Sequence, residues 1–186
     1  MLLNFEFVLE TLISSRTRIK LLLKLFLNSN TSAWLRGLEA EFGESSNAIR
    51  IELNRFEDAG MIVSSMMGNK KVYSANTRHP LFREIHNILL KHIGFDKIIE
   101  TVIERLGAVD RVYVTGDFAK GTDSQVIDLV FIGSTIDKNY LMQLIERAED
   151  LISRRIRFII YPPAELEKNT WDEAEKNMLL LWSEKQ

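Results

Sequence analysis

The sequence predicts an α+β / α/β chain in two parts: three helices and a β-hairpin come first, and a small mixed-sheet α/β domain follows. Before residue 60, apolar residues recur at helical spacing in three successive segments. A Gly68-Asn69 turn then separates two short strand-like runs. Beyond residue 94, strand patterns alternate with helical ones. We therefore expect a first domain at 1–78, a connecting helix at 79–94 and a second domain at 95–186.

The composition allows one domain or two small ones, because 46% of the 186 residues are hydrophobic. The net charge of −2 does not indicate a nucleic-acid partner for the chain as a whole. Residues 1–80 hold 10 basic and 8 acidic side chains, and residues 81–186 hold 14 and 18, so the first part is the more basic. The absence of cysteine excludes disulfides, thiolate zinc sites and a thiol nucleophile.

No targeting or membrane segment is apparent in the sequence. Residues 1–10 lack a basic region followed by a long apolar run, so we expect no signal peptide. The apolar stretches are far shorter than the roughly 18 residues that indicate a membrane span. We expect a cytoplasmic protein that does not contact the membrane.

Two helices are predicted first. The segment 14–28 carries apolar residues at helical spacing, and Ser14 or Ser15 can cap its start by accepting a bond from a first-turn amide. The segment from Trp34 to Phe42 forms the second helix, which Gly43 ends.

The third predicted helix lies within residues 44–60 and has two different faces. Ile49, Leu53 and Phe56 form a buried stripe. The other face is short-polar and basic, which suits a DNA major groove, where arginine pairs with guanine and asparagine with adenine. Its candidate DNA-binding residues are Ser46, Asn47, Arg50 and Asn54.

A basic hairpin is predicted next, with strands at 61–65 and 70–74. Lys70 and Lys71 near its tip are candidates for contact with backbone phosphates. Three helices followed by a basic hairpin is the order of a winged helix-turn-helix. A packing module for another protein is the alternative interpretation of the same order.

Residues 14–76 resemble the ArsR-type winged-helix regulators. The likeness rests on Glu52-Leu-Asn-Arg-Phe-Glu-Asp-Ala-Gly-Met-Ile-Val and on Gly68-Asn-Lys-Lys-Val-Tyr. The resemblance implies DNA binding as a dimer, with the third helix in the major groove. The metal-sensing cysteines of some members are absent here, so metal responsiveness is not implied.

A connecting helix is predicted over residues 81–93, where it either packs between domains or pairs with its twin in a dimer. His79-Pro80 marks its boundary, because a residue before proline disfavours the helical conformation. His79, His86 and His92 lack the three- or four-residue spacing of ligands on one helical face. We expect no metal site there.

The second domain is predicted to alternate helices and strands. Helices are expected at 95–106 and 140–152, and strands at 111–115, 126–132 and 156–161. A final helical stretch is expected to end at 178–182. The 10-residue gap between the first two strands is short for a parallel crossover, which favours a mixed sheet.

Two features of this domain are not generic: Gly116-Asp-Phe-Ala-Lys-Gly121 after a strand, and Asp128 inside an apolar strand. Together they resemble the nucleotidyltransferases of the DNA polymerase β superfamily, whose pattern is Gly-Ser-x-Ala-x-Gly followed by Ser-Asp-x-Asp-Leu. The resemblance implies a remnant nucleotide site at Gly116, Asp117, Lys120, Gly121 and Asp128.

The departures from that pattern fall on the chemistry. Asp117 stands in place of the serine, Val126 in place of the first aspartate, and Arg155 and Arg157 occupy the stretch where a third carboxylate is expected. A lone carboxylate does not bridge two metal ions for phosphoryl transfer. We therefore expect no catalysis and no cofactor.

The sequence leaves several roles open for this domain. It is either a sensor of a small-molecule or nucleotide ligand, with Arg155, Arg157 and Lys120 as candidate lining, or a dimerisation scaffold in which Asp128 pairs with Lys120 or an arginine. The runner-up function is a Mg²⁺-dependent nucleotidyltransferase that uses Asp128 with Asp117 or Asp123. The leading prediction is a homodimeric, sequence-specific regulator bound to duplex DNA.

Overall fold

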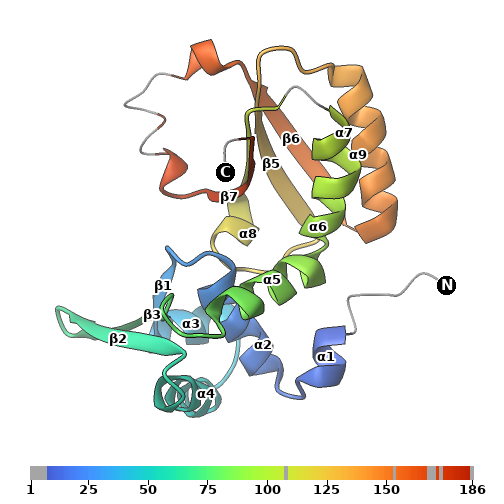
Figure 1. Ribbon diagram of the computed structural model, residues 1–186. Coiled ribbons are helices and arrows are strands. Elements are labelled where there is room, and N and C mark those ends of the chain that lie inside the picture. The colour runs from blue at the N-terminus through green and yellow to red at the C-terminus, as the bar shows by residue number, and fades with distance from the viewer. Residues whose placement is uncertain (1–7, 107–108, 153, 167–170, 172–173, 185–186) are drawn as a thin grey trace. The chain divides into compact units, whose positions relative to one another are not determined.

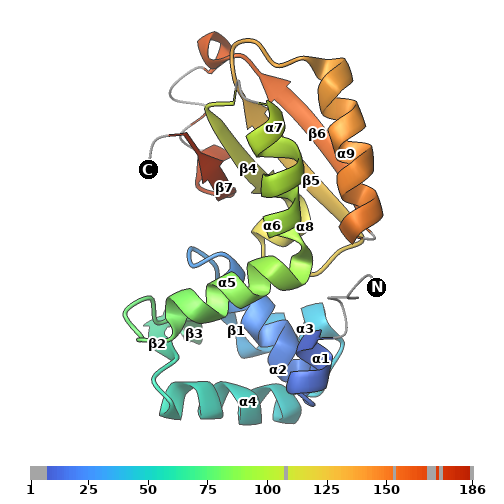
Figure 2. The same cartoon turned by 45° about the vertical axis from the view of Figure 1, so that its right-hand side comes forward.

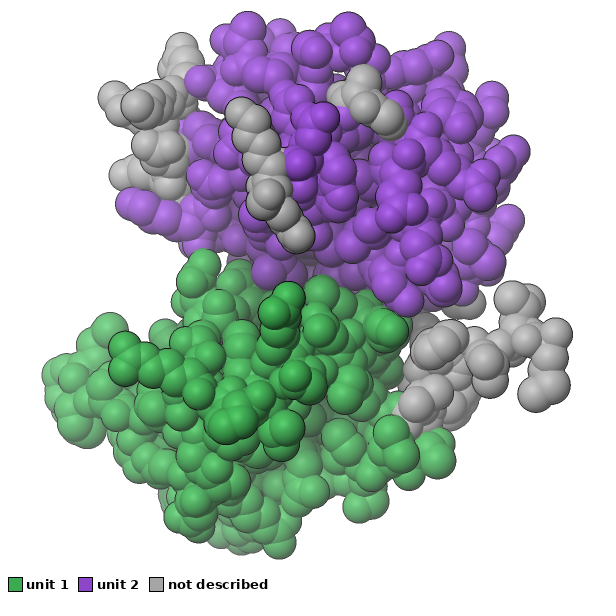
Figure 3. Space-filling model, in the orientation of Figure 1, with its two compact units in different colours: residues 1–92 green, residues 93–186 purple. Residues whose placement is uncertain are grey.

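The protein is a mixed α+β chain that divides into two compact units, residues 1–92 and 93–186 (Figure 3). The computed structural model describes residues 8–106, 109–152, 154–166, 171 and 174–184. Each unit contains one small sheet and its own helices (Figure 1).

Four helical segments open unit 1. They are α1 (Val8–Leu12), α2 (Arg16–Leu22) with its π-helical continuation η2 (Leu23–Leu27), α3 (Leu35–Phe42) and α4 (Ser46–Asp58). The Ser15 hydroxyl accepts a hydrogen bond from the Arg18 amide and thereby caps α2. Of the two predicted capping residues, Ser14 and Ser15, it is Ser15 that caps the helix. Gly43 ends α3 in the left-handed conformation, with φ of 64°, as predicted.

A three-stranded antiparallel sheet completes unit 1. Its strands are β1 (Ser32–Trp34), β2 (Ile62–Met67) and β3 (Lys70–Ala75), in the order β1-β3-β2. The predicted hairpin is confirmed as β2 and β3, with Gly68 at φ of 61° in the turn. Strand β1 was not predicted, because three residues are too few to show an alternating pattern.

The core of unit 1 lies between α2, α3 and α4. The buried apolar side chains include the predicted stripe residues of α4, and Phe26 contacts the Phe56 ring edge-on at 6.2 Å. Helix α5 (Phe82–Ile93) packs here too, since Phe82 lies 5.9 Å from Phe26 and a ring nitrogen of His86 hydrogen bonds the Phe26 carbonyl at 2.9 Å. The core members at 0% exposure are Leu21, Leu25, Phe26, Leu27, Leu38, Ile49 and Leu53.

Unit 2 begins with a continuous helical stretch of α6 (Phe95–Ile98), the π-helix η3 (Ile99–Ile103) and α7 (Glu104–Leu106). Strand β4 (Arg111–Thr115), the short helix α8 (Gly116–Ala119), strand β5 (Val126–Ile132), helix α9 (Lys138–Ile152) and strand β6 (Arg155–Tyr161) follow. The 3₁₀ turn η4 (Pro163–Glu165) and strand β7 (Leu179–Ser183) complete the described elements.

The sheet of unit 2 has the order β6-β5-β4-β7 and is mixed, as predicted: β4 and β5 are antiparallel, and β5 and β6 are parallel. The helices α6, η3 and α9 contact one another and lie on one face of it (Figure 2). Because strand side chains alternate, buried Val112, Leu129 and Ile156 belong to that covered face. Thr115, Asp128 and Arg157 belong to the opposite face.

The predicted helical stretch ending at 178–182 is wrong, because residues 179–183 form strand β7. The run Met178-Leu-Leu-Leu-Trp182 has no polar residues to reveal a period, and such short apolar runs fit a buried strand as well as a helix. Strand β4 offers its free edge, so β7 pairs with it antiparallel, with Val114 opposite Leu179.

None of the helices in the described ranges has the length and apolar character needed to cross a lipid bilayer.

Candidate functional site

The outer face of α4 presents the polar residues that the sequence singled out. Asn47, Arg50 and Asn54 are exposed, and their spacings of three and four place them on one side of the helix. Ser46, half-buried, lies one turn before Arg50. Within the described ranges, the side chains of Asn47, Arg50 and Asn54 have no hydrogen bond or ion pair with another side chain. They are therefore available to an external partner.

Ile51 is an exposed apolar residue on this same face, with 44% of its surface accessible. The sequence reasoning missed it, because the helix was divided into an apolar stripe and a polar face. Its only signal was its position beside Arg50, outside the stripe of Ile49, Leu53 and Phe56. An apolar side chain there suits contact with a thymine methyl group.

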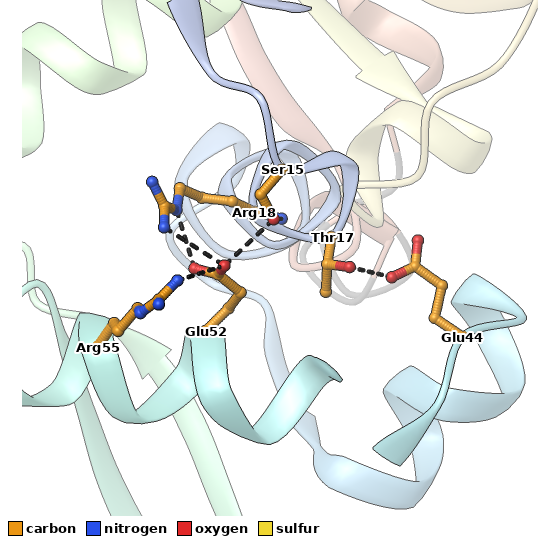
Figure 4. Close-up of polar contacts among 6 residues, drawn as sticks. All are labelled: Ser15, Thr17, Arg18, Glu44, Glu52 and Arg55. Atoms are coloured by element: carbon orange, nitrogen blue, oxygen red, sulfur yellow. Dashed lines mark hydrogen bonds and ion pairs between the residues drawn. The ribbon is translucent and has the colours of Figure 1, made fainter. Parts of the chain in front are cut away.

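A buried carboxylate fixes α4 against α2 (Figure 4). Glu52 of α4 has a side-chain exposure of only 7%, and Arg18 approaches it with Nε 2.8 Å from Oε2. The Ser15 hydroxyl donates to Oε1 at 3.2 Å, and Arg55 Nη1 lies 3.0 Å from the same oxygen. Since Ser15 also caps α2, one side chain joins the start of α2 to the middle of α4.

A second carboxylate, Glu44, holds the turn between α3 and α4 (Figure 4). Lys20 Nζ lies 2.7 Å from Glu44 Oε1 and donates to the Phe42 carbonyl at 3.0 Å. The Thr17 hydroxyl also donates to Glu44. Sequence reasoning missed both carboxylates, because their partners on and before α2 lie more than 20 residues away along the chain.

The pKa values of both carboxyl groups are lowered. For Glu52, burial raises the pKa, but the hydrogen bonds and charge of Arg18 outweigh it. For Glu44, burial likewise raises the pKa, and Lys20 and Thr17 outweigh it. Both groups are therefore ionised at neutral pH and attached to α2.

The two lysines of the hairpin have different surroundings. Lys70 Nζ lies 4.5 Å from the centre of the Trp34 ring, a cation–π contact that leaves its charge unneutralised. Lys71 Nζ lies 2.8 Å from Glu57 Oε2, and this bond raises the pKa of Lys71 and lowers that of Glu57. Lys70 is thus the more available of the two to a phosphate.

In unit 2 the structure brings Gly116 and Asp128 together. Gly116 follows β4 at φ of 66°, and a Cβ there would lie 2.6 Å from Asp128 Oδ2, so only glycine fits. Asp117 and Lys120 are exposed, and the Asp117 carbonyl accepts the amide of Lys120 at 3.0 Å. Gly121, at φ of 74°, ends this turn.

Asp128 pairs with an arginine, one of the two partners that the sequence suggested. Arg157 lies directly opposite it in the β5–β6 register and donates two bonds, Nε to Oδ1 at 2.7 Å and Nη2 to Oδ2 at 2.9 Å. Lys120 is not its partner. Arg155, also considered as lining, pairs instead with Glu149 at 2.9 Å.

Asp123 has a separate partner. The Arg154 side chain, only 3% exposed, lies 2.8 Å from Asp123 and stacks over the Phe118 ring at 5.3 Å. A divalent cation at Asp128 would have to displace Arg157, and one at Asp123 would compete with Arg154. Across the described residues, no three His, Asp or Glu side chains gather in a way that suits a metal ion.

A cavity of about 500 Å³ lies on the face of the unit 2 sheet that also carries Asp128 and Arg157. Sequence reasoning missed it, because its walls come from strands β4, β5 and β6 and from the chain beyond η4. Its described lining residues are Thr115, Val130, Ile159, Tyr161, Glu165, Leu166, Trp171, Ala174 and Met178.

A scan against models of protein families finds none that matches the chain, and a search of curated proteins finds no match either.

Proposed function

We propose that the protein is a sequence-specific DNA-binding transcription regulator whose unit 1 is an ArsR-like winged helix-turn-helix. The observation that carries the proposal is the face of α4 on which Asn47, Arg50 and Asn54 lie exposed and unpaired within the described ranges. The hairpin that follows α4 holds Lys70 with its charge unneutralised. Helix, helix, helix and basic hairpin is the winged-helix order, in which the third helix enters the major groove.

Support also comes from how α4 is held. A recognition helix binds better when its orientation is fixed before binding, because ordering a mobile helix on the DNA would cost binding free energy. The Glu52 and Glu44 contacts attach α4 and the turn before it to α2. These contacts use the inner side of α4 and leave the polar face free.

We propose further that the regulator is a homodimer that reads a roughly palindromic site. Leu81 lies just before α5 and Ile88 lies on it. Both are exposed apolar residues, and they are seven positions apart. That spacing places them on one helical stripe that a second copy of α5 can cover. Unit 2, a catalytically degenerate nucleotidyltransferase-like domain in this proposal, serves dimerisation or ligand sensing.

The first test separates base contacts from phosphate contacts. We expect Arg50→Ala to lose about 1–3 kcal/mol of binding to a preferred duplex and much less to a scrambled one. Lys70→Ala is expected to weaken binding to both duplexes alike and to reduce the salt slope by about 1. Fluorescence anisotropy over a range of salt concentrations measures both.

Arg147→Ala is the matched control, because Arg147 is an exposed arginine of α9 in unit 2. It removes the same charge without touching α4 or the hairpin. If Arg50→Ala and Lys70→Ala both bind DNA like this control, unit 1 does not read DNA through α4.

A further inference from the structure

The tip of the unit 1 hairpin, residues 66–71, extends beyond the rest of its sheet (Figure 1). On the side of the tip, the last pair that β1 makes with β3 is Trp34 opposite Val72. Past this pair, the described sheet consists of β2 and β3 alone. Gly68, at φ of 61°, and Asn69 join the two strands in a two-residue turn. The tip is therefore a narrow, two-stranded projection.

Two neighbouring methionines give this tip an apolar character that the fold itself does not use. Met66 is 67% exposed and Met67 is 70% exposed. Because successive side chains on a strand point to opposite faces, one methionine lies on each face of the tip. Met66 stands opposite Lys71. Met67 stands opposite Lys70, so each face carries one methionine and one lysine. Side chains this exposed contribute little to folding, so both methionines can be replaced without loss of the structure.

The tip is held in a fixed position relative to α4. Glu57, in the last turn of α4, accepts a bond from the Ser64 hydroxyl of β2 at 2.5 Å and pairs with Lys71 of β3 at 2.8 Å. Both strands are therefore attached to the helix that the proposed function seats in the major groove. Since major and minor grooves alternate across each phosphate backbone, a projection beside that helix meets a backbone and then the minor groove.

The minor groove of B-DNA is too narrow for this tip. Two paired strands lie about 4.8 Å apart before their side chains are counted, and the groove is about 6 Å wide. A tip with a methionine and a lysine on each face enters only if the groove opens. The groove opens when an apolar side chain enters between two base pairs and kinks the duplex toward the major groove. Lys70, whose charge is unneutralised, is then available to a phosphate at the groove edge.

We propose that Met66 and Met67 form an apolar wedge that enters the minor groove, partly unstacks a base step and bends the DNA. The inference rests on the proposed function of unit 1 and adds an activity to it, the deformation of the bound duplex. Pyrimidine–purine steps unstack most easily, so we expect the bound site to carry such a step at a position that α4 does not contact. A membrane surface also takes up methionines and lysines, but the attachment of the tip to α4, with its exposed Arg50, favours DNA.

A duplex of about 30 base pairs, selected by the wild-type full chain from a random pool, tests the wedge with two readouts. Dyes at its two ends report bending by energy transfer, and a fluorescent adenine analogue at the pyrimidine–purine steps brightens when it is unstacked. We expect the wild type to bend the duplex by at least about 20° and to brighten the analogue. The double variant Met66→Gln/Met67→Gln is expected to lose both signals. It should still prefer the selected duplex to a scrambled one, because Arg50 is unchanged.

Met142→Gln is the matched control, because Met142 is an exposed methionine of α9 in unit 2. A selected duplex that the wild type binds without bending or unstacking overturns the inference and leaves the proposed function standing. A double variant that bends the duplex as Met142→Gln does has the same consequence. An unbent duplex, together with binding to phosphatidylserine vesicles that the double variant loses, would assign the tip to a membrane instead. Recovery of no shared sequence from the pool would overturn the inference and the proposed function together.

Discussion

Glu52 is the residue on which the position of α4 depends most directly. Its carboxylate receives bonds from Ser15, Arg18 and Arg55, and its side chain is 7% exposed. Removing the charge leaves the guanidinium of Arg18, itself half-buried, without its partner. Hydrogen bonds to charged groups contribute more to stability than neutral ones, so we expect this loss to destabilise α2 and α4 together.

We expect Glu52→Gln to lower the free energy of unfolding of unit 1 by about 1–3 kcal/mol at neutral pH. The lowered pKa values of Glu52 and Glu44 mean that their stabilisation is full above their unfolded-state pKa and is lost as pH falls through the folded-state values. Wild type is therefore expected to lose stability as the pH falls below about 4.5, the ordinary pKa of a glutamate. Glu52→Gln should show a shallower loss.

Hydrogen exchange of the α2 and α4 amides, measured by mass spectrometry at neutral and acid pH, reports this locally. Glu84→Gln is the control, because Glu84 is an exposed glutamate of α5. Protection of α2 and α4 that is the same in both variants at neutral pH contradicts the role assigned to Glu52.

At the residue scale, the sequence predicted the features that depend on residues close together along the chain. The cap at Ser15 and the left-handed glycines depend on neighbouring residues, so they were predictable. The partner of Asp128 was narrowed to a lysine or an arginine, but its choice of Arg157 depends on strand register. The contacts of Glu52 with Arg18 and of Lys71 with Glu57 depend on chain folding and had no sequence signal.

At the element scale, a carboxylate joins the hairpin to α4. Glu57, in the last turn of α4, accepts bonds from Lys71 of β3 at 2.8 Å and from the Ser64 hydroxyl of β2 at 2.5 Å. Both strands of the hairpin are thus fastened to the helix that precedes them. The ion pair with Glu57 also neutralises the Lys71 charge and makes it less available to a phosphate.

We expect Glu57→Gln to strengthen binding to every duplex by about three- to tenfold at low salt and to steepen the salt slope by about 1, because Lys71 becomes free. Filter binding at several salt concentrations measures both quantities. Glu104→Gln changes the net charge equally at an exposed position of unit 2 and is the control. An unchanged slope in Glu57→Gln would mean that Lys71 does not reach the phosphate backbone.

Elements with a clear period were predicted well, and those without one were not. Helices α4 and α9 follow stripes of apolar residues. Strand β5 is a long apolar run that is interrupted only by Asp128. Strand β7 was wrongly predicted as a helix. It is a strand because it pairs with β4, which lies more than 60 residues earlier in the chain and leaves no signal in the local sequence. Strand β1 is too short to carry a pattern.

At the scale of the whole molecule, the net charge of −2 gives no general attraction to nucleic acid. We therefore propose that DNA affinity comes from a local surface, the α4 face and the hairpin, and not from overall charge.

Selection of bound fragments from a random duplex pool by the purified full chain, at two salt concentrations, tests the central claim most directly. We predict recovery of one shared, roughly palindromic sequence, retained at the higher salt, because base contacts from Arg50 and the asparagines are less salt-dependent than phosphate contacts. Recovery of fragments with no shared sequence, or of no fragments, would contradict a sequence-specific regulator.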